Sequence, residues 1–318
     1  MTALTCPSCG ATAPPSMAAC PSCGHLFHGD ELRRRVEAAG AYEGGGDLVS
    51  ALGELRLAIG LVPPGSRQHE ALRARIAALE IAAPRQGTPM PAWLAGLGAG
   101  GAVLWKLAGP LLVVLSKGKV VLLGLAQTKT LLSLFFTASL YERVGGGVVA
   151  LLLLGSIYIH EMGHVLAFQR YGIAVSAPMF IPGFGAFVRG SHYPEAPAAQ
   201  ADVALSGPWF GLATGVLVLA AGLALGWPDG LTGAAVIAEM NAFNLIPVWQ
   251  LDGNRALVVL SRGQRAALGL AGLAVCAPAG LSMGVVAAVG HLLRALVTPA
   301  DAPGDAGALR SFVGVVIL

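Results

Sequence analysis

The stretch Leu151–Gly172, LLLLGSIYIHEMGHVLAFQRYG, is the part of the sequence around which the rest of the chain is organised. It contains an H-E-x-x-H pattern at positions 160–164. Residues four apart on a helix leave from the same face, so the imidazoles of His160 and His164 can bind one metal ion. Glu161 lies beside that face and is placed to accept a proton from a water molecule. The pattern therefore predicts a hydrolytic metal site on a helix.

The setting of this pattern is apolar. The preceding residues Val148–Ile159, VVALLLLGSIYI, carry no charge. Ionisable side chains at the end of such a run are costly in lipid, and by default they mark a function. On the motif alone a second interpretation stays open, in which two histidines and a salt-bridged glutamate simply pack inside a helix bundle.

The composition is that of a membrane protein. Of 318 residues, 55% are hydrophobic and 12% are charged, whereas ordinary soluble domains carry about 25% charged residues. The formal net charge of +3 is too small and too dispersed to indicate nucleic-acid binding. The N-terminal sequence MTALTCPSCG has no basic segment followed by an apolar one, so we expect no signal peptide and a cytosolic N-terminus.

Several apolar segments are long enough to cross a bilayer, which takes about 20 residues. Two early segments carry lysines, and we expect one of them to lie at the membrane interface instead of spanning. The fold class predicted is a multi-pass α-helical membrane protein with about five or six transmembrane helices, preceded by a small cytosolic zinc ribbon and a helical module. The early segments are Trp93–Leu115 and Val120–Leu140; the later spans are Val144–Phe168, Ala204–Leu225, Leu231–Trp249 and the block Ala266–Val297, in which Pro278 is a potential break.

Arginine placement sets the expected orientation. Arg170 and Arg189 follow the motif helix, and further arginines follow Trp249, whereas the turn at 226–230 has none. Positive residues favour the cytosolic side, so the metal-site pattern lies toward the cytosolic end of its helix. We expect a multi-pass protein of a prokaryotic cell membrane.

Four of the five cysteines form a repeated C-P-x-C-G pattern near the N-terminus. Each repeat places two thiolates on one tight turn, and two such turns supply the four sulfurs of a closed structural zinc site. A redox or disulfide role is the alternative, which a cytosolic location disfavours. The expected ligands are Cys6, Cys9, Cys20 and Cys23. Cys276 lies in an apolar segment and is expected to be a small core residue.

Residues 31–83 are predicted to form a helical module. Asp47 and Ser66 are expected N-caps of two of its helices, and the spacing from Gly46 to Pro63 resembles half of a tetratricopeptide repeat. One repeat cannot bury its own face, so the module is either a binding element for a cytosolic regulatory partner or a spacer. The predicted domains are residues 1–30, 31–83, a linker at 84–91, and a membrane domain at 92–318.

A candidate third ligand lies in the stretch 244–253, NLIPVWQLDG. Asp252 is an ionisable residue at the end of an apolar helix that Pro247 and Gly253 interrupt. Two histidines and one carboxylate leave a fourth zinc position open for water, as hydrolysis requires. Taken alone, Asp252 fits a helix-end cap equally well.

Together, H-E-x-x-H on one membrane helix and N-x-x-P-x-x-x-x-D-G at the end of a later one resemble the site-2 protease family of intramembrane zinc metallopeptidases, peptidase family M50. The resemblance covers roughly Leu151–Arg255. It implies that His160, His164 and Asp252 bind a catalytic zinc ion and that Glu161 is the catalytic acid and base.

The same resemblance implies further roles. Asn244 would hold the scissile peptide or its oxyanion, and the loop 179–187 would present an extended edge to an unwound substrate. Gly211 stands where many members of the family have asparagine. Substrate contacts are accordingly expected at Asn244, Pro247, Gly185 and Phe187.

The function predicted is therefore hydrolysis of peptide bonds within or near the transmembrane segments of membrane proteins, with one catalytic and one structural Zn²⁺. The expected partners are transmembrane substrates and the lipid bilayer, without nucleic acid. Two other classes stay open: a membrane-bound zincin that cleaves soluble or misfolded proteins at the membrane surface, and a metal-binding membrane scaffold without catalysis.

Overall fold

The computed structural model describes residues 3–82, 128–181, 185–299 and 304–317, with a few isolated positions between 96 and 112. The predicted linker at 84–91 and nearly all of the early apolar segment at 93–115 lie outside the described residues. The chain divides into two compact units. Unit 1 holds residues 1–85 with the short segments 170–173 and 193–199, and unit 2 holds the rest.

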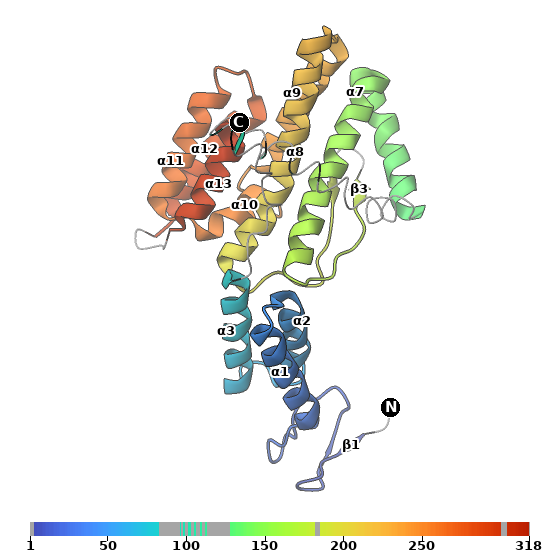
Figure 1. The fold of residues 1–318 in the computed structure, drawn as a ribbon, viewed down its shortest axis with the longest axis vertical. Coiled ribbons are helices and arrows are strands. Elements are labelled where there is room, and N and C mark those ends of the chain that lie inside the picture. The colour runs from blue at the N-terminus through green and yellow to red at the C-terminus, as the bar shows by residue number, and fades with distance from the viewer. Residues whose placement is uncertain are drawn as a thin grey trace. The chain divides into compact units, whose positions relative to one another are not determined.

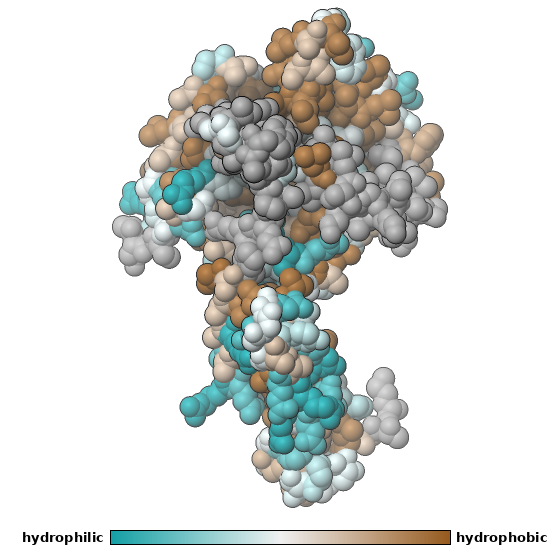
Figure 2. All heavy atoms as spheres, viewed as in Figure 1, coloured by the Kyte–Doolittle hydropathy of each residue, from teal (hydrophilic) through white to brown (hydrophobic). Residues whose placement is uncertain are grey.

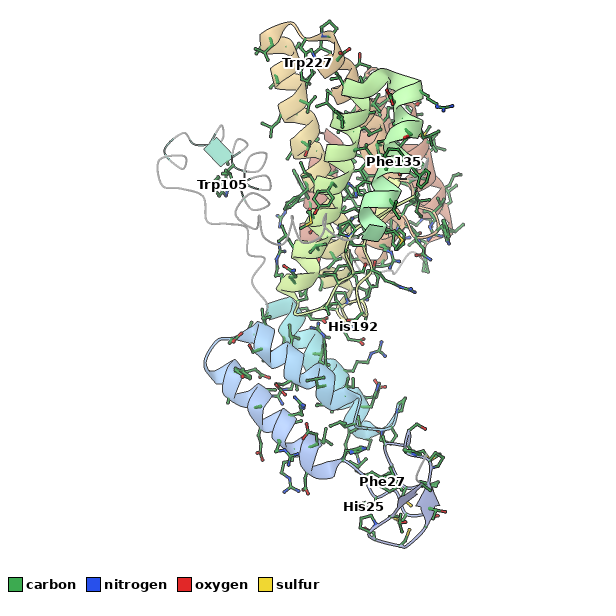
Figure 3. All side chains as sticks on the ribbon, turned by 90° about the vertical axis from the view of Figure 1, so that its right-hand side faces the viewer. His25, Phe27, Trp105, Phe135, His192 and Trp227 are labelled. Atoms are coloured by element: carbon green, nitrogen blue, oxygen red, sulfur yellow. The ribbon has the colours of Figure 1, made fainter. Side chains whose placement is uncertain are left out.

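Unit 1 begins with two similar cysteine turns. The strands β1 (Leu4–Thr5) and β2 (Thr12–Ala13) pair antiparallel across the first turn. In each turn a glycine at positive φ, Gly10 or Gly24, donates its N–H to the carbonyl of the first cysteine. A residue without a Cβ adopts this left-handed backbone at no steric cost, which explains the glycine in both repeats. His25 and Phe27 mark this end of the unit in Figure 3.

Three helices follow in unit 1: α1 (Gly29–Gly44), α2 (Leu48–Ile59) and α3 (Arg67–Ala82). Asp47 caps α2 through the Ser50 N–H, and the Ser66 hydroxyl accepts from the His69 N–H at the start of α3. Both predicted caps are confirmed. The helices share one apolar core, so the module buries its own faces and is more than the isolated hairpin that a single repeat would give. That core contains Ala39, Leu52, Leu55, Ala58, Val62, Leu72 and Ile76.

The two later segments of unit 1 are held by a buried ion pair. Arg56 of α2 and Glu80 of α3 lie 2.7 Å apart, and the Glu80 side chain is fully buried. The second Glu80 carboxylate oxygen accepts the N–H of Ala196 at 2.7 Å, and Arg56 donates to the Tyr171 carbonyl. Both charges therefore have the partners that burial demands. The two segments that Arg56 and Glu80 hold come just before and just after residues 174–192 in the sequence, and those residues belong to unit 2.

Unit 2 begins with α7 (Thr128–Arg170), a helix in two parts. Gly146 has φ 80° and ψ 164°, so the helix breaks there and restarts. Ala138 and Tyr141 of the first part pack on a cluster that includes Leu153 and Leu154 of the second. Figure 1 shows the two parts as neighbouring green ribbons that meet at one end of the unit.

A short antiparallel hairpin follows, with β3 at Met179–Ile181 and β4 at Gly185–Phe187. Phe180 is buried and stacks on Tyr158 of α7, with ring centroids 6.5 Å apart. The opposite face presents Met179, Ile181 and Phe187, each about two-fifths exposed. The extended loop expected here is thus a hairpin with one face on α7 and one apolar face outward; residues 182–184 lie outside the described part.

The helices α8 (Pro197–Leu225) and α9 (Pro228–Asn244) are joined by a turn at Trp227, at the opposite end of unit 2 from His192 (Figure 3). A Cβ at Gly163 of α7 would lie 2.6 Å from the Ser206 carbonyl oxygen of α8. Small residues permit such close helix packing inside a membrane. Helix α9 ends at Asn244, five residues before the predicted end of its span, because the backbone before Pro247 disfavours helix.

Beyond α9 come α10 (Asp252–Ala256), the short 3₁₀ turn η1 (Leu257–Val259), α11 (Arg262–Cys276), α12 (Ser282–Val297) and α13 (Ala306–Ile317). The predicted break at Pro278 is confirmed, since α11 and α12 are separate helices. They pack with α13 around a core that contains Leu257, Leu260 and Phe312.

Two of the described helices are long and apolar enough to cross a bilayer: Gly145–Arg170 and Pro197–Leu225. Shorter apolar helices cover Ser282–Val297 and Ala306–Val316. Figure 2 shows hydrophobic residues dominating the described surface of unit 2 and hydrophilic ones that of unit 1. Leu151, Leu223 and Leu296 are each more than two-thirds exposed, which fits a lipid-facing surface. The mostly helical, membrane-type fold agrees with the sequence prediction.

Candidate active site and metal centres

Three side chains from two distant stretches converge in unit 2. Nε2 of His160 lies 3.2 Å from Nε2 of His164. Oδ2 of Asp252 lies 3.1 Å from the former and 3.3 Å from the latter. Asp252 is 92 positions after His160, and it arrives here because it opens α10 directly after the turn that follows α9.

The hydrogen bonds on the far side of each ring fix its tautomer. Nδ1 of His164 lies 2.9 Å from the carbonyl oxygen of Val203, which can only accept, so this nitrogen carries a proton. Nδ1 of His160 lies 3.1 Å from Oδ1 of Asn241. The Asn241 amide nitrogen donates to the Ile237 carbonyl at 3.0 Å, so its oxygen faces the histidine as an acceptor.

With both Nδ1 atoms protonated, the two Nε2 atoms of the neutral rings are acceptors, and so is the Asp252 carboxylate. Three acceptors within 3.3 Å of one another repel unless a cation lies among them. A tetrahedral zinc ion with bonds of about 2.0–2.2 Å separates its nitrogen and oxygen ligands by roughly 3.3–3.5 Å. The donor types and spacings therefore fit zinc.

Gly207 of α8 leaves the space in front of the two rings open. A Cβ at this position would lie 2.2 Å from Nε2 of His164 and 2.6 Å from Nε2 of His160. A zinc ion bound to both nitrogens would lie about 2.0–2.1 Å from each of them, so this Cβ would lie close to the place of the ion. Any side chain at position 207 would therefore compete with the metal for the same volume.

Glu161 lies at one end of a small cleft beside the rings. Its carboxylate is within 4.8 Å of the ligand atoms of both histidines, and the residue is 95% buried. The backbone N–H of Val188, just after β4, hydrogen-bonds to it. The hairpin therefore covers the glutamate and holds it near the point where the three ligand atoms meet.

The four predicted substrate contacts fall in different places. Gly185 and Asn244 line the cleft with His160 and Glu161. Phe187 lies on the outward face of the hairpin. Pro247 is buried away from the cleft, where a Cβ on Gly290 of α12 would lie 2.7 Å from its ring. The structure thus brings Gly185 and Asn244 to Glu161 but does not bring Pro247 there.

The loop that delivers Asp252 is braced from both sides. Trp249 has φ 48°, and its carbonyl accepts from the Asn254 side chain at 2.8 Å. Arg294 of α12 donates to Asn254 Oδ1 at 2.7 Å. A Cβ on Gly253 would lie 1.9 Å from the Leu245 carbonyl oxygen, so only glycine fits after Asp252.

The cysteine cluster in unit 1 is a second candidate metal centre by its geometry. The Sγ atoms of Cys6 and Cys23, and those of Cys9 and Cys20, are 3.6 Å apart, and all four lie within 4.8 Å of one another. Bonds of about 2.3 Å to a tetrahedral zinc ion would separate sulfurs by roughly 3.8 Å, whereas a disulfide needs about 2.05 Å. Backbone N–H groups of Cys23 and Ser22 lower the pKa of the Cys20 thiol to about 6, whereas the pKa values of Cys9 and Cys23 are raised.

The sequence did not reveal the residues that support the histidines. Val203 acts through its carbonyl, which no side-chain pattern can indicate. Gly207 acts through the side chain it lacks, which a sequence pattern does not indicate either. Asn241 carries a usable signal, because it is a polar side chain inside an apolar helix. It lies outside the motif that begins at Asn244, however, so the motif does not indicate it.

Comparison with known proteins agrees with this geometry. The family model of peptidase family M50 matches residues 148–237. This segment is similar to peptidase family M50. The M50 match includes both histidines, Glu161, Gly207 and the first part of α9.

Two curated proteins are similar to part of this chain. The probable zinc metalloprotease EGY2, a chloroplastic protein of Arabidopsis thaliana, is 30% identical over 125 residues, which are 37% of this chain and 21% of that protein. The zinc metalloprotease MJ0392 of Methanocaldococcus jannaschii is 26% identical over 121 residues, 36% of this chain and 35% of its own length. The chain thus spans about a fifth and about a third of these relatives. No solved structure matches the chain.

Proposed function

We propose that this chain is a membrane-embedded zinc metalloendopeptidase that hydrolyses peptide bonds within or near transmembrane segments of other membrane proteins. The observation that carries the proposal is the meeting of three acceptor atoms within 3.3 Å beside a buried glutamate, on helices that include two of spanning length. The names of both relatives, which describe zinc metalloproteases, support the same reaction.

In this proposal His160, His164 and Asp252 hold zinc, whose chemistry when bound is to acidify water and polarise a peptide carbonyl. Glu161 accepts the proton of the attacking water and later delivers it to the leaving amine. Burial under the hairpin excludes bulk water, and the Val188 N–H orients the carboxylate.

The cleft and the hairpin suggest how a substrate binds. Asn244 uses one amide hydrogen on the Met240 carbonyl at 3.3 Å and has a second for the carbonyl of a bound peptide. The outward face of β3 and β4, with Met179, Ile181 and Phe187, is an apolar edge against which an unwound segment can extend. A helical substrate hides its carbonyls in internal hydrogen bonds, so unwinding must precede attack.

We further propose a multi-pass arrangement in the cell membrane with a cytoplasmic N-terminus, and two zinc ions per chain, one at the His–His–Asp site and one at the cysteine cluster. The arginines that follow α7 and α9 support this orientation.

The decisive test compares the membrane proteomes of cells that carry the wild type, Glu161→Gln or Glu142→Gln. Glu142 is the other glutamate of α7 and is exposed, so it is the matched control. Removal of the base should lower turnover by at least ~10²-fold, and intact membrane proteins should accumulate only with Glu161→Gln.

The result also separates the alternatives. Accumulation of soluble proteins alone would favour a zincin that works at the membrane surface. Identical proteomes in all three strains, with two zinc ions retained in the purified chains, would favour a scaffold and would refute the peptidase proposal.

For the N-terminal module we propose a role in recruiting or gating substrates. The buried Arg56–Glu80 pair binds Tyr171 and Ala196, at the two ends of the excursion that carries β3 and β4. The double variant Arg56→Met, Glu80→Gln removes both charges together, which avoids leaving one of them buried and unpaired. The control is Arg34→Met, which breaks the exposed Arg34–Glu31 pair. Unchanged cleavage of every substrate by the double variant would refute this role.

A further inference from the structure

A single amide links the proposed zinc site to the next helix. Oδ1 of Asn241 on α9 lies 3.1 Å from Nδ1 of His160, and its amide nitrogen is fixed by the Ile237 carbonyl at 3.0 Å. Asn241 is 91% buried, and nothing in the sequence motifs marks it. The Nδ1 atom of His160 is thus hydrogen-bonded to a side chain, whereas the Nδ1 atom of His164 is hydrogen-bonded to a backbone carbonyl.

The position that faces Asn241 is a glycine whose absent side chain makes room for the amide. A Cβ built on Gly211 of α8 would lie 2.0 Å from Oδ1, 2.6 Å from Nδ2 and 2.7 Å from Cγ of Asn241. All three atoms of the amide are therefore inside the space that any residue larger than glycine at 211 would occupy. Positions 211 and 241 thus share one volume, which the Asn241 amide fills and which a side chain at 211 would also need.

We propose that Asn241 is the residue that orients His160 for zinc. Position 211 of α8 is a glycine because the amide of Asn241, which belongs to α9, fills the space in front of it. The inference rests on the zinc site of the proposed function. An acceptor at Nδ1 keeps the proton on that nitrogen and leaves the lone pair of Nε2 directed at the metal. Without the acceptor the ring is free to take the other tautomer, in which Nε2 carries a hydrogen and cannot bind zinc.

Asn241 also separates two spaces. On one side is the cleft with Glu161 and Asn244. On the other is a largely apolar cavity of about 380 Å³ bounded by α8, α9, α11, α12 and α13. Asn241 thus lines both spaces, and a smaller residue at this position would leave less side chain between the apolar cavity and His160.

The experiment uses the full chain and reads the metal directly. Cobalt(II) in place of zinc distinguishes the two centres, because only the cysteine cluster gives thiolate charge-transfer absorption. Competition with a chelator then measures the affinity of the His–His–Asp site while the cysteine cluster serves as an internal reference for folding.

Two single variants should weaken that site. Asn241→Leu keeps the volume but removes the acceptor, and Gly211→Ala removes no polar atom but displaces the amide. Loss of such a supporting hydrogen bond typically costs about 10–100-fold in metal affinity, and we expect both variants to fall in that range. Gly215→Ala is the matched control, one turn along α8, where the new Cβ would meet only a methyl group of Ile237 at 3.1 Å.

The swap Gly211→Asn, Asn241→Ala is the critical variant. It returns an amide to the same volume from the opposite helix, so we expect it to recover at least about 10-fold of the lost affinity. Wild-type affinity in Asn241→Leu, or failure of the swap to recover affinity in a chain whose cysteine cluster still binds cobalt, would overturn the inference. A wild-type chain whose His–His–Asp site binds no metal would instead overturn the proposed function itself.

Discussion

The two candidate metal centres of this chain are built in opposite ways. The cysteine cluster takes all four ligands from two turns, and its first and last ligands lie only 17 positions apart; each turn is shaped by its own glycine and backbone hydrogen bonds. The His–His–Asp site joins residues 92 positions apart, and its geometry depends on α7, α8, α9 and a braced loop. The geometry of the local site is determined by the local sequence. The geometry of the dispersed site changes whenever the packing of the helices that carry its ligands changes.

The difference extends to chemistry. Four cysteines saturate a tetrahedral ion, which gives a closed structural site, while three ligands leave one position for water. At the dispersed site the space for the ion, in front of the two histidine rings, is kept open by Gly207, which belongs to another helix. This space is thus a tertiary feature, and a change in α8 can fill it without touching a ligand.

The largest expected effect comes from filling the space for the ion. Gly207→Ala places a Cβ 2.2 Å from His164 Nε2, so we expect complete loss of metal at this site and no detectable peptidase activity, while the cysteine cluster stays loaded. The zinc content measured by atomic absorption should fall from two ions to one. Ser206→Ala is the control, since it removes only a hydroxyl that bonds to Asp202 within the same helix. Two zinc ions in Gly207→Ala would show that the site tolerates a side chain in the metal volume.

An intermediate effect is expected at the local site. Cys20→Ser should release the zinc of the cysteine cluster and unfold its two turns, because the binding free energy of such sites, about 10–16 kcal/mol, is also their folding free energy. The affinity of the His–His–Asp site should change by less than about 3-fold, an allowance for indirect effects between independent sites. Chelator competition and mass spectrometry on the intact chain test both statements. Cys276→Ser, a cysteine of the α11–α12 region, should keep both ions; loss of both ions in Cys20→Ser would show that the centres are coupled.

The smallest expected effect concerns the brace of the Asp252 loop. Arg294→Ala removes the hydrogen bond to Asn254, and such a bond contributes about 0.5–1.5 kcal/mol. We expect zinc to leave the His–His–Asp site about 2–10-fold faster, with no change at the cysteine cluster. Arg34→Ala, in the exposed pair of α1, is the control. Equal release rates in wild type and Arg294→Ala would mean that the brace does not stabilise the loop.

Much of the site was readable because its ligands belong to short motifs. Helical spacing alone put His160 and His164 on one face, and the caps of the N-terminal helices followed from Asp47 and Ser66. The end of α9 was predicted less well, because Pro247 marks a break but not how many residues before it the helix stops. The number of spans is likewise underdetermined: a run such as 231–249 is apolar enough, yet the helix within it covers Pro228–Asn244.

What the sequence by itself determined is the chemistry of the donors: two histidines and a glutamate on one helix, an aspartate after a helix break, and four thiols on two turns. These follow from the 3.6-residue period and from local backbone sterics. Only the tertiary structure decided which carbonyl and which amide bind the outer nitrogens, that Pro247 lies away from the cleft, and that Gly207 and Gly211 are spaces filled from elsewhere. Such roles arise from contacts between helices. A glycine in the sequence shows that a side chain is absent, but it does not show which group from another helix fills the space.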